Sequence, residues 1–374
     1  DKPALHEFFV VDMIQGGAGT STNMNVNEVI ANLGLIRMGH RPGDYDHLHP
    51  NDDVNRSQST NDVYPTALRL AIVDQCAAFR DAQLRLCAAF DDRAAAFAHI
   101  RKIGRTQLQD AVPMTLGQEF AGFAATIRED IAIIARLSEL LLEVNLGGTA
   151  IGTRVNTPDG YAERAVAELA LVSGLKVTLA GDLVEASSDT GAYVTFSGVL
   201  KRIAVKLSKI CNDLRLLSSG PRSGFNEIRL PAMQAGSSIM PGKVNPVIPE
   251  VVNQVAFQVI GNDLTVTMAA EAGQLQLNAF EPVIILNLLQ SMRMLIRAMD
   301  TLATRCVAGI EANVAQCEGA LENSLVLATM LVPHIGYTRA ARVAKTALAD
   351  GAGVAETAQR LGFGSHEEIA AWLR

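Results

Sequence analysis

The 374-residue chain has few aromatic residues (5%) and few charged residues (19%). So few aromatic side chains argue against an ordinary all-β domain, while a hydrophobic fraction of 49% is too high for a disordered chain. No run of about 18 uninterrupted apolar residues occurs, so we expect no membrane-spanning helix. The positive mean hydropathy of +0.19 therefore predicts helices that are covered on more than one side.

Clustered basic residues are also missing, and the net charge is -7. Binding to nucleic-acid phosphates requires grouped lysine and arginine, so we expect no nucleic-acid partner. The five cysteines include no C-x-x-C pair, which indicates a reducing compartment. The first residues lack the basic start and apolar core of a signal peptide, so we expect a cytoplasmic location.

Glycine and proline are distributed unevenly, and this is the main signal for the architecture. Neither occurs in Thr66–Ile103, where apolar side chains recur three or four residues apart, as in a helix. Four similar segments follow, at Leu116–Leu146, Ala192–Ser219, Pro249–Ala272 and Pro282–Ala308. Strand signals are weak, with Lys176–Leu179 the best short candidate. The sequence predicts an all-α fold with an elongated central five-helix bundle, and side-by-side association of several bundles to cover its apolar faces.

The amino-acid composition changes on both sides of these segments. Residues 1–60 are rich in glycine, asparagine, histidine and aspartate, and beyond Asn313 the helical segments shorten and glycine returns. We therefore expect three domains: an N-terminal piece at 1–60, the helical centre at 61–315, and a small helical piece at 316–374.

Four polar segments, three of which contain glycine, interrupt the helical background and adjoin ends of the long helices. They are Gln15–Asn23, Ser57–Asp62, Gly104–Asp110 and Gly236–Pro246. The first lacks the lysine and the preceding strand of a phosphate loop. Its hydroxyls, like those of Ser59 and Thr60, are consistent with simple helix caps. They also suit a carboxylate bound at a helix N-terminus, and the two interpretations are compatible.

The segment Gly236–Pro246 is the most specific of the four. It places Lys243 and Asn245 near two serines in a loop constrained by proline and glycine. A cation and an amide can stabilise a carboxylate whose neighbouring carbon loses a proton, giving an aci-carboxylate. Ser237 could be the base only if its hydroxyl were unusually acidic. The acidic side chain of Glu250 interacts favourably with the dipole at the start of the next helix. It is also a candidate to assist proton transfer.

Other chemistry-bearing residues give weaker signals. His47 and His49 could bind a metal, but no third ligand has suitable spacing, so a polar loop is the preferred interpretation. We therefore expect no metal and no cofactor. Arg101, Lys102 and Arg105 form a short basic cluster, interpreted as a solvated helix end.

The string G-S-S-I-M-P-G-K-V-N-P at Gly236–Pro246, with Q-G-G-A-G-T from Gln15 and G-G-T-A-I-G from Gly147, resembles the aspartase/fumarase superfamily over essentially the whole chain. Fumarases usually have histidine where this chain has Gln107, so it resembles the aspartases more closely. The resemblance implies a reversible anti elimination of ammonia from L-aspartate to give fumarate. Two alternatives stay open: a class II fumarase, and a non-catalytic crystallin-like oligomeric scaffold.

The resemblance also implies roles for individual residues. Ser237 would take the proton from Cβ. The β-carboxylate would be held by Thr20, Ser59, Thr60 and the Ser238 N–H, the α-carboxylate by Thr106, Lys243 and Asn245, and the leaving ammonia would face Asn61 and Gln107. Without the resemblance, Lys243 and Asn245 would be expected to stabilise the doubly charged aci-carboxylate. The resemblance implies that most of this charge is stabilised by the hydroxyl groups that hold the β-carboxylate.

The resemblance further implies a small dicarboxylate substrate and a three-domain lyase subunit. Such subunits form a homotetramer through a helical core, with each active site built from three subunits. Arg154 departs from the family pattern, which usually has glycine there. Both ends of the chain are short compared with the family, so a truncated chain is expected.

Overall fold

The computed structural model describes residues 3–373. By its internal contacts the chain divides into two compact units. The first unit contains the described part of Asp1–Gln83, together with Glu129–Leu207 and Gln254–Ala298. The second contains Leu84–Arg128, Ser208–Asn253 and the described part of Met299–Arg374. These units do not test the predicted domain boundaries after residues 60 and 315, which stay predictions.

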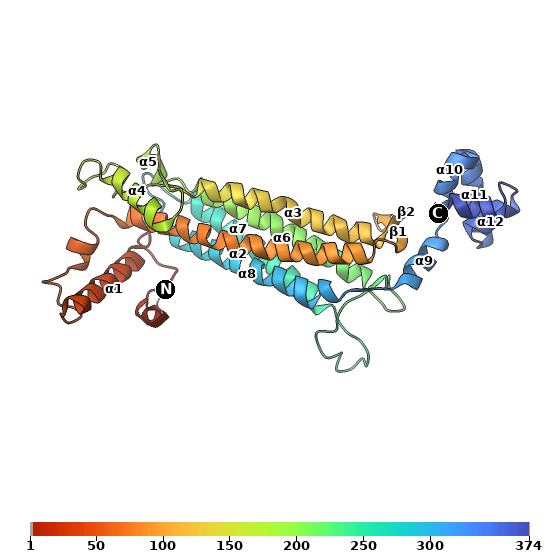
Figure 1. The fold of residues 1–374 in the computed structure, drawn as a ribbon, viewed down its shortest axis with the longest axis horizontal. Coiled ribbons are helices and arrows are strands. Elements are labelled where there is room, and N and C mark those ends of the chain that lie inside the picture. Colours follow the sequence, from red (N-terminus) through yellow and green to blue (C-terminus); the bar gives the residue numbers. More distant parts are fainter. Residues whose placement is uncertain (1–2, 374) are drawn as a thin grey trace. The chain divides into compact units, whose positions relative to one another are not determined.

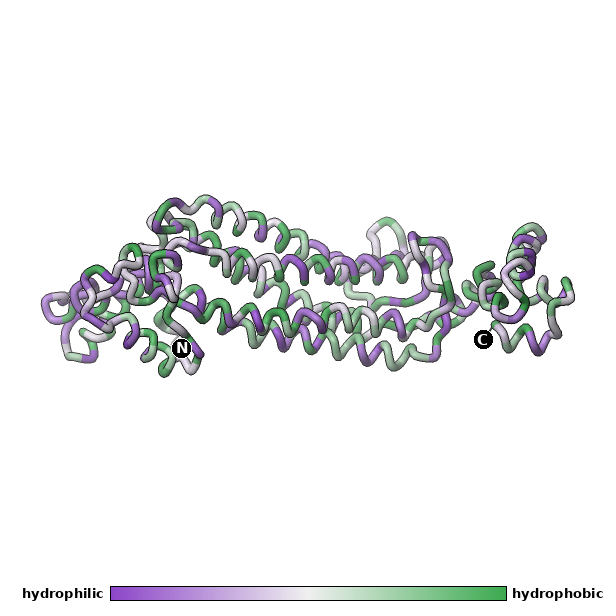
Figure 2. Tube along the Cα trace, turned by 90° about the horizontal axis from the view of Figure 1, so that it is seen from above, coloured by the Kyte–Doolittle hydropathy of each residue, from purple (hydrophilic) through white to green (hydrophobic). Residues whose placement is uncertain are grey.

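Five long helices run through the chain and confirm the main prediction (Figure 1). They are α2 (Thr60–Ala96), α3 (Leu116–Leu140), α6 (Gly191–Leu217), α7 (Val247–Glu271) and α8 (Glu281–Arg305). Each contributes a segment to both units. Buried apolar residues lie on all five of them, and Figure 2 shows hydrophobic residues recurring along the long helical segments. The second unit has a separate core cluster in its C-terminal part, which includes Leu331, Val343 and Ala358.

Shorter elements complete the fold. The first unit also contains η1 (Pro3–Phe8), α1 (Thr20–Met38), the π-helical η2 (Pro50–Val54), α4 (Tyr161–Ser173) and α5 (Leu183–Ala186). The second also contains η3 (Val307–Gly309), α9 (Val314–Glu322), η4 (Leu325–Leu327), α10 (Ala328–Ile335), α11 (Tyr337–Asp350), α12 (Val354–Arg360) and α13 (His366–Trp372).

Helix α2 begins and ends earlier than the glycine and proline pattern predicted. It starts at Thr60, so Pro65 lies inside it. A proline has no N–H to donate to the carbonyl four residues before it. That carbonyl, of Asn61, instead accepts a hydrogen bond of 2.9 Å from Nδ2 of Asn145. A distant side chain thus satisfies the group that Pro65 leaves open.

The other end of α2 was predicted wrongly. The helix stops at Ala96, and Arg101–Ile103 belong to an antiparallel hairpin of β1 (Arg101–Thr106) and β2 (Gln109–Thr115). Its two-residue turn is Gln107-Leu108, whose φ angles are 54° and 63°. Hairpin turns of this kind usually carry Asn-Gly or a similar pair, so the sequence offered no turn signal.

Two further strand pairs are only two residues long. In the first unit β3 (Glu143–Val144) pairs in parallel with β4 (Thr178–Leu179), which lies within the short strand candidate. In the second unit β5 (Ile228–Arg229) pairs with the antiparallel β6 (Glu311–Ala312). The chain is therefore all-α with small strand pairs.

Helix α8 and the turn after it, Glu281–Gly309, are long and apolar enough to cross a membrane by length and composition. Core helices of globular proteins pass the same test. The apolar side chains of α8 are largely buried inside the protein, among them Ile284, Leu288, Met292 and Leu295. The hydropathy of this helix is thus accounted for by packing within the chain.

Glu281, the first residue of α8, is a carboxyl group buried in the first unit. Burial raises its pKa from the ordinary 4.5 to about 8, and the positive charge of Arg69 offsets only part of this effect. Burial raises the pKa of the nearby Tyr64, and the Glu281 carboxylate adds to this effect. A carboxyl group in this position is more stable when it is protonated.

We expect Glu281→Gln to remove a pH dependence of stability. Below pH 4.5 the carboxyl is protonated in both the folded and the unfolded chain; between 4.5 and 8 only the unfolded chain ionises. The free energy of unfolding should therefore fall in this window by about 1.4 kcal/mol per pH unit, on the order of 5 kcal/mol in all. Glu281→Gln should unfold like the unaltered protein at pH 4 and be more stable at pH 8 in urea titrations.

The exposed Glu271→Gln is the matched control, because it removes a carboxylate from solvent. Its stability should follow that of the unaltered protein at both pH values. A Glu281→Gln variant with no gain at pH 8 would contradict the expected titration of this group.

Candidate active site

The N-terminal ends of α1 and α2 lie together in the first unit. The turn Gly17-Ala18-Gly19, with φ angles of 83°, 55° and 91°, leads into Thr20. A Cβ on Gly19 would lie 2.5 Å from the Tyr64 ring, so only glycine fits against α2. Nδ2 of Asn23 donates to Oγ1 of Thr60 over 3.0 Å. Two helix N-termini, each favourable for an anion, are thereby held side by side.

The start of α2 is fixed by Asp62, which is fully buried. Its Oδ1 accepts from the Ser59 N–H over 3.0 Å. Its Oδ2 accepts from the N–H groups of Gly147 and Thr149 over 3.0 and 2.9 Å. Burial raises the pKa of Asp62, although these hydrogen bonds act in the opposite direction. This carboxyl joins the loop after Gly147 to the predicted substrate-binding residues.

The side chains of this group present defined hydrogen-bonding groups. Nδ2 of Asn61 donates to the Ala150 carbonyl over 2.7 Å, which leaves Oδ1 as the acceptor of that amide. Because Thr60 Oγ1 accepts from Asn23, its proton remains available to donate. Ser59 Oγ accepts from the Asn61 N–H over 3.2 Å. The Thr20 hydroxyl donates to the Gly17 carbonyl over 2.7 Å.

The predicted residues Thr106 and Gln107 lie at the tip of the β1–β2 hairpin in the second unit, and both are exposed. Gln107 has a positive φ, which costs a non-glycine residue on the order of 1 kcal/mol. Strained backbone of this kind gathers at functional sites. The hairpin is also tied to η4, because Ser324 Oγ donates to Asp110 Oδ2 over 2.7 Å.

The basic cluster belongs to strand β1 of this hairpin and is not the solvated helix end that the sequence suggests. Lys102 is only 2% exposed, and its Nζ lies 2.5 Å from Glu119 Oε2 and 2.6 Å from Glu227 Oε2. Arg105 forms an ion pair with Glu227 over 2.6 Å and stacks on the Phe225 ring. Buried charges persist only when they are paired. Here the pairs fix β1 to α3 and to the segment before β5.

The loop Gly236–Asn245 closes on itself in the second unit. The Ser237 N–H donates to the Lys243 carbonyl over 3.0 Å, and the Lys243 N–H donates to the Met240 carbonyl over 3.1 Å. Oγ of the half-buried Ser237 accepts from the N–H groups of Met240 and Ile239, over 3.2 and 3.4 Å. Ser238, Lys243 and Asn245 are exposed.

Glu250 is half-buried in the first turn of α7, which begins two residues after this loop. An acidic side chain there is favourable for the helix dipole. The predicted residues thus form two groups. Thr20 and Ser59–Asn61 belong to the first unit, and Thr106, Gln107, the serine loop and Glu250 belong to the second.

Comparison with known proteins shows which family the chain belongs to. The family described as "Lyase" matches residues 3–261, and the family described as "Fumarase C C-terminus" matches residues 327–374. An aspartate ammonia-lyase of Pseudomonas fluorescens is 62% identical over 360 residues, which are 96% of this chain and 75% of the relative. The chain belongs to the aspartate ammonia-lyase family.

Solved structures of related lyases have the same fold. A Brucella melitensis structure named "fumarate lyase:delta crystallin", bound to cobalt, is 64% identical, with a TM-score of 0.97 over 99% of this chain and 80% of its own. A class II fumarase of Schistosoma mansoni has a TM-score of 0.92, also over 99% of this chain and 80% of its own, but is only 34% identical. Both therefore share the fold, and the fumarase is much less similar in sequence than the aspartate ammonia-lyase of Pseudomonas fluorescens.

Arg154, which differs from the usual aspartase glycine, has a φ of 62°. Glycine adopts this left-handed conformation without the steric cost that a side chain brings, which explains why glycine is usual there. The arginine is accommodated because its side chain points to solvent and forms an ion pair with Glu163 over 2.7 Å. Its N–H donates to the Gly148 carbonyl, so the loop keeps its closure.

Proposed function

We propose that the chain catalyses the reversible anti elimination of ammonia from L-aspartate, giving fumarate. The observation that carries this proposal is the 62% identity to an aspartate ammonia-lyase over nearly the whole chain, against 34% for the fumarase. Gln107 is consistent with it, because an amide orients an amino group but cannot relay a proton as imidazole does.

Ser237 is the proposed base that removes the Cβ proton. A serine hydroxyl can act in this way only if negative charge on Oγ is stabilised. Two backbone N–H groups, of Ile239 and Met240, are directed at Oγ in the closed turn of the loop. Such donors stabilise developing oxyanions, and this geometry supports Ser237 rather than another residue of the loop.

The hydroxyl-bearing residues at the two helix N-termini form the proposed site for the carboxylate that becomes the aci-carboxylate. Thr60 has a proton to donate, and Ser59 lies at the N-terminus of α2. Thr20 would contribute once its hydroxyl turned away from the Gly17 carbonyl. The Ser238 N–H would complete the set. Positive dipole ends and hydroxyl donors together stabilise a second negative charge.

The other end of the substrate would be held by Lys243, Asn245 and Thr106. The exposed Lys243 carries the positive charge that an α-carboxylate requires. Asn61 presents an oxygen acceptor, which suits an ammonium group because ammonium only donates. Gln107 would contact the same amino group, while Glu250 would assist proton transfer.

A homotetramer with active sites shared by three subunits is part of the proposal. Helix α7 carries exposed apolar residues three or four positions apart, at Phe257, Ile260, Leu264 and Met268, which are 37% to 63% exposed. We call these four residues the α7 stripe. An apolar stripe of this kind on a helix already packed on its other face is typical of an interface. A second copy of the same helix is the proposed occupant.

The test is to follow fumarate absorbance with L-aspartate and, separately, with L-malate. Fumarate from aspartate alone supports the proposal. Turnover of malate without aspartate turnover would make the protein a fumarase. A well-formed oligomer without activity on either substrate would instead favour the crystallin-like scaffold.

A further inference from the structure

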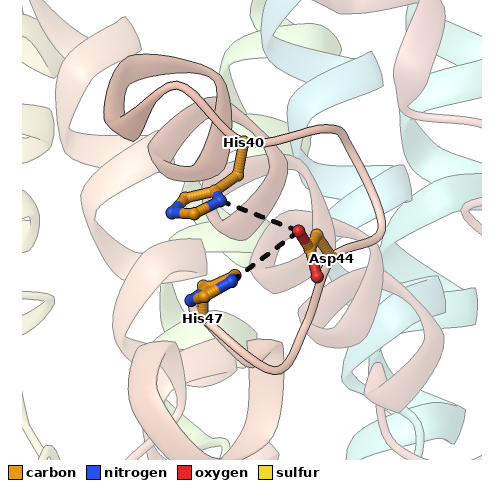
Figure 3. A group of neighbouring side chains, drawn as sticks. All are labelled: His40, Asp44 and His47. Atoms are coloured by element: carbon orange, nitrogen blue, oxygen red, sulfur yellow. Dashed lines mark ion pairs between the residues drawn. The ribbon is translucent and has the colours of Figure 1, made fainter.

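Three side chains with metal-binding atoms lie close together in the loop between α1 and η2. This part of the sequence contains none of the predicted substrate-binding residues. Nδ1 of His40 lies 3.7 Å from Oδ2 of Asp44, and Nε2 of His47 lies 3.9 Å from the same oxygen (Figure 3). All three ligand atoms lie within 4.8 Å of one another. We propose that His40, Asp44 and His47 bind a divalent cation of the Zn²⁺ or Co²⁺ type.

The backbone holds this arrangement in place. The His40 N–H donates to the Leu35 carbonyl, which fixes His40 against the last turn of α1. The Asp44 N–H donates to the Arg41 carbonyl and the His47 N–H to the Asp44 carbonyl, so two successive turns bring the three residues to one side. Asn32 of α1 anchors the loop as well, since its Oδ1 accepts from the Gly43 N–H over 2.7 Å.

The three ligand atoms are close enough to share one ion. The two imidazole rings stack with centroids 3.8 Å apart, and each directs a nitrogen towards Asp44 (Figure 3). The nitrogen-to-oxygen distances exceed those of hydrogen bonds. A metal about 2.0–2.2 Å from each ligand holds its ligand atoms roughly 3–4 Å apart. Because the ion must lie near the plane of both imidazoles, the two rings would rotate out of their stacked arrangement when it binds.

The ligand types select the class of cation. Two imidazole nitrogens and one carboxylate oxygen suit Zn²⁺, Co²⁺ or Ni²⁺, whereas Mg²⁺ and Ca²⁺ prefer oxygen ligands. The sequence suggested His47 with His49, but His49 is engaged elsewhere, because its Nδ1 accepts from the N–H groups of Asn51 and Asp52. Only the folded loop shows that the partners of His47 are His40 and Asp44.

A bound ion would join the end of α1 to the segment that leads into α2. It would stabilise the first unit, since a ligand that binds only the folded state raises the stability of that state. The proposal is independent of the proposed reaction, because no step of the elimination passes through this loop.

The experiment uses untagged, EDTA-treated full chain titrated with Co²⁺, by calorimetry and by the visible absorption of the bound ion. We expect one saturable site per subunit. His47→Ala should weaken binding at least about tenfold, and Asp44→Asn should weaken it too. His99→Ala removes an exposed histidine outside the loop and should bind Co²⁺ like the unaltered chain.

Thermal unfolding supplies a second measurement. Co²⁺ should raise the Tm of the unaltered chain and of His99→Ala but not that of His47→Ala. Equal affinity in the unaltered chain and in both loop variants would overturn the proposal. So would the lack of saturable binding below about 1 mM Co²⁺.

Discussion

Replacing Ser237 with alanine is expected to lower kcat for fumarate formation from L-aspartate by about 10²- to 10⁴-fold, the range contributed by a general base. The variant keeps the backbone turn, because the hydrogen bonds that close it join the Ser237 N–H to Lys243 and the Lys243 N–H to Met240. Substrate binding should change little, since the proposed carboxylate and ammonium contacts come from other residues. The measurement is steady-state fumarate absorbance, with the oligomeric state checked by size-exclusion chromatography.

Ser238→Ala is the matched control for this variant. The neighbouring serine is exposed and is proposed to act through its backbone N–H, which alanine retains. Its turnover should stay within about tenfold of the unaltered protein, far above Ser237→Ala. If Ser237→Ala kept full turnover, or if both variants lost the same amount, Ser237 would not be the base.

Replacing Leu264 of the α7 stripe with glutamate is expected to break the assembly and to remove activity with it. Leu264 is 61% exposed in the single chain, and a second copy of α7 would bury it. An unpaired carboxylate in an apolar interface costs roughly several kcal/mol. Because each active site is proposed to need residues from three subunits, turnover should fall in proportion to the remaining tetramer. Light scattering gives the oligomeric state, and fumarate absorbance gives turnover.

The control for this interface is Leu348→Glu on α11, where the leucine is 69% exposed. It makes the same change of side chain away from the α7 stripe, and should leave both the tetramer and turnover intact. A Leu264→Glu protein that remained a fully active tetramer would exclude the α7 stripe from the interface. A stable, active monomer would exclude shared active sites altogether.

The long helices could be predicted because their signal is local. Apolar spacing and the lack of glycine and proline are enough to place α3, α6, α7 and α8 within a few residues of their observed starts. The hairpin β1–β2 could not be predicted in this way. Its turn is Gln107-Leu108 rather than a glycine-containing pair, and its start lies in a segment free of glycine and proline.

The candidate site also has one part that local sequence predicts and one part that it does not. Its residues are found in polar motifs that are contiguous in the sequence, such as Ser57–Asp62 and Gly236–Pro246. The residues that position them are not contiguous with them. Asp62 joins α2 to Gly147 and Thr149, more than eighty residues later, and only burial and two hydrogen bonds reveal this role.

The sequence by itself determined the helical class, the five long helices, the motifs of the aspartase family and the residues proposed to meet the substrate, because periodicity and motif spacing are properties of neighbouring residues. Only the tertiary structure decided that Lys102 is buried between two glutamates and that Asn145 satisfies the carbonyl left open by Pro65. It also decided that His47 meets His40 and Asp44. Charges and polar groups are paired through the folded chain, and their partners depend on which distant segments exclude water from them.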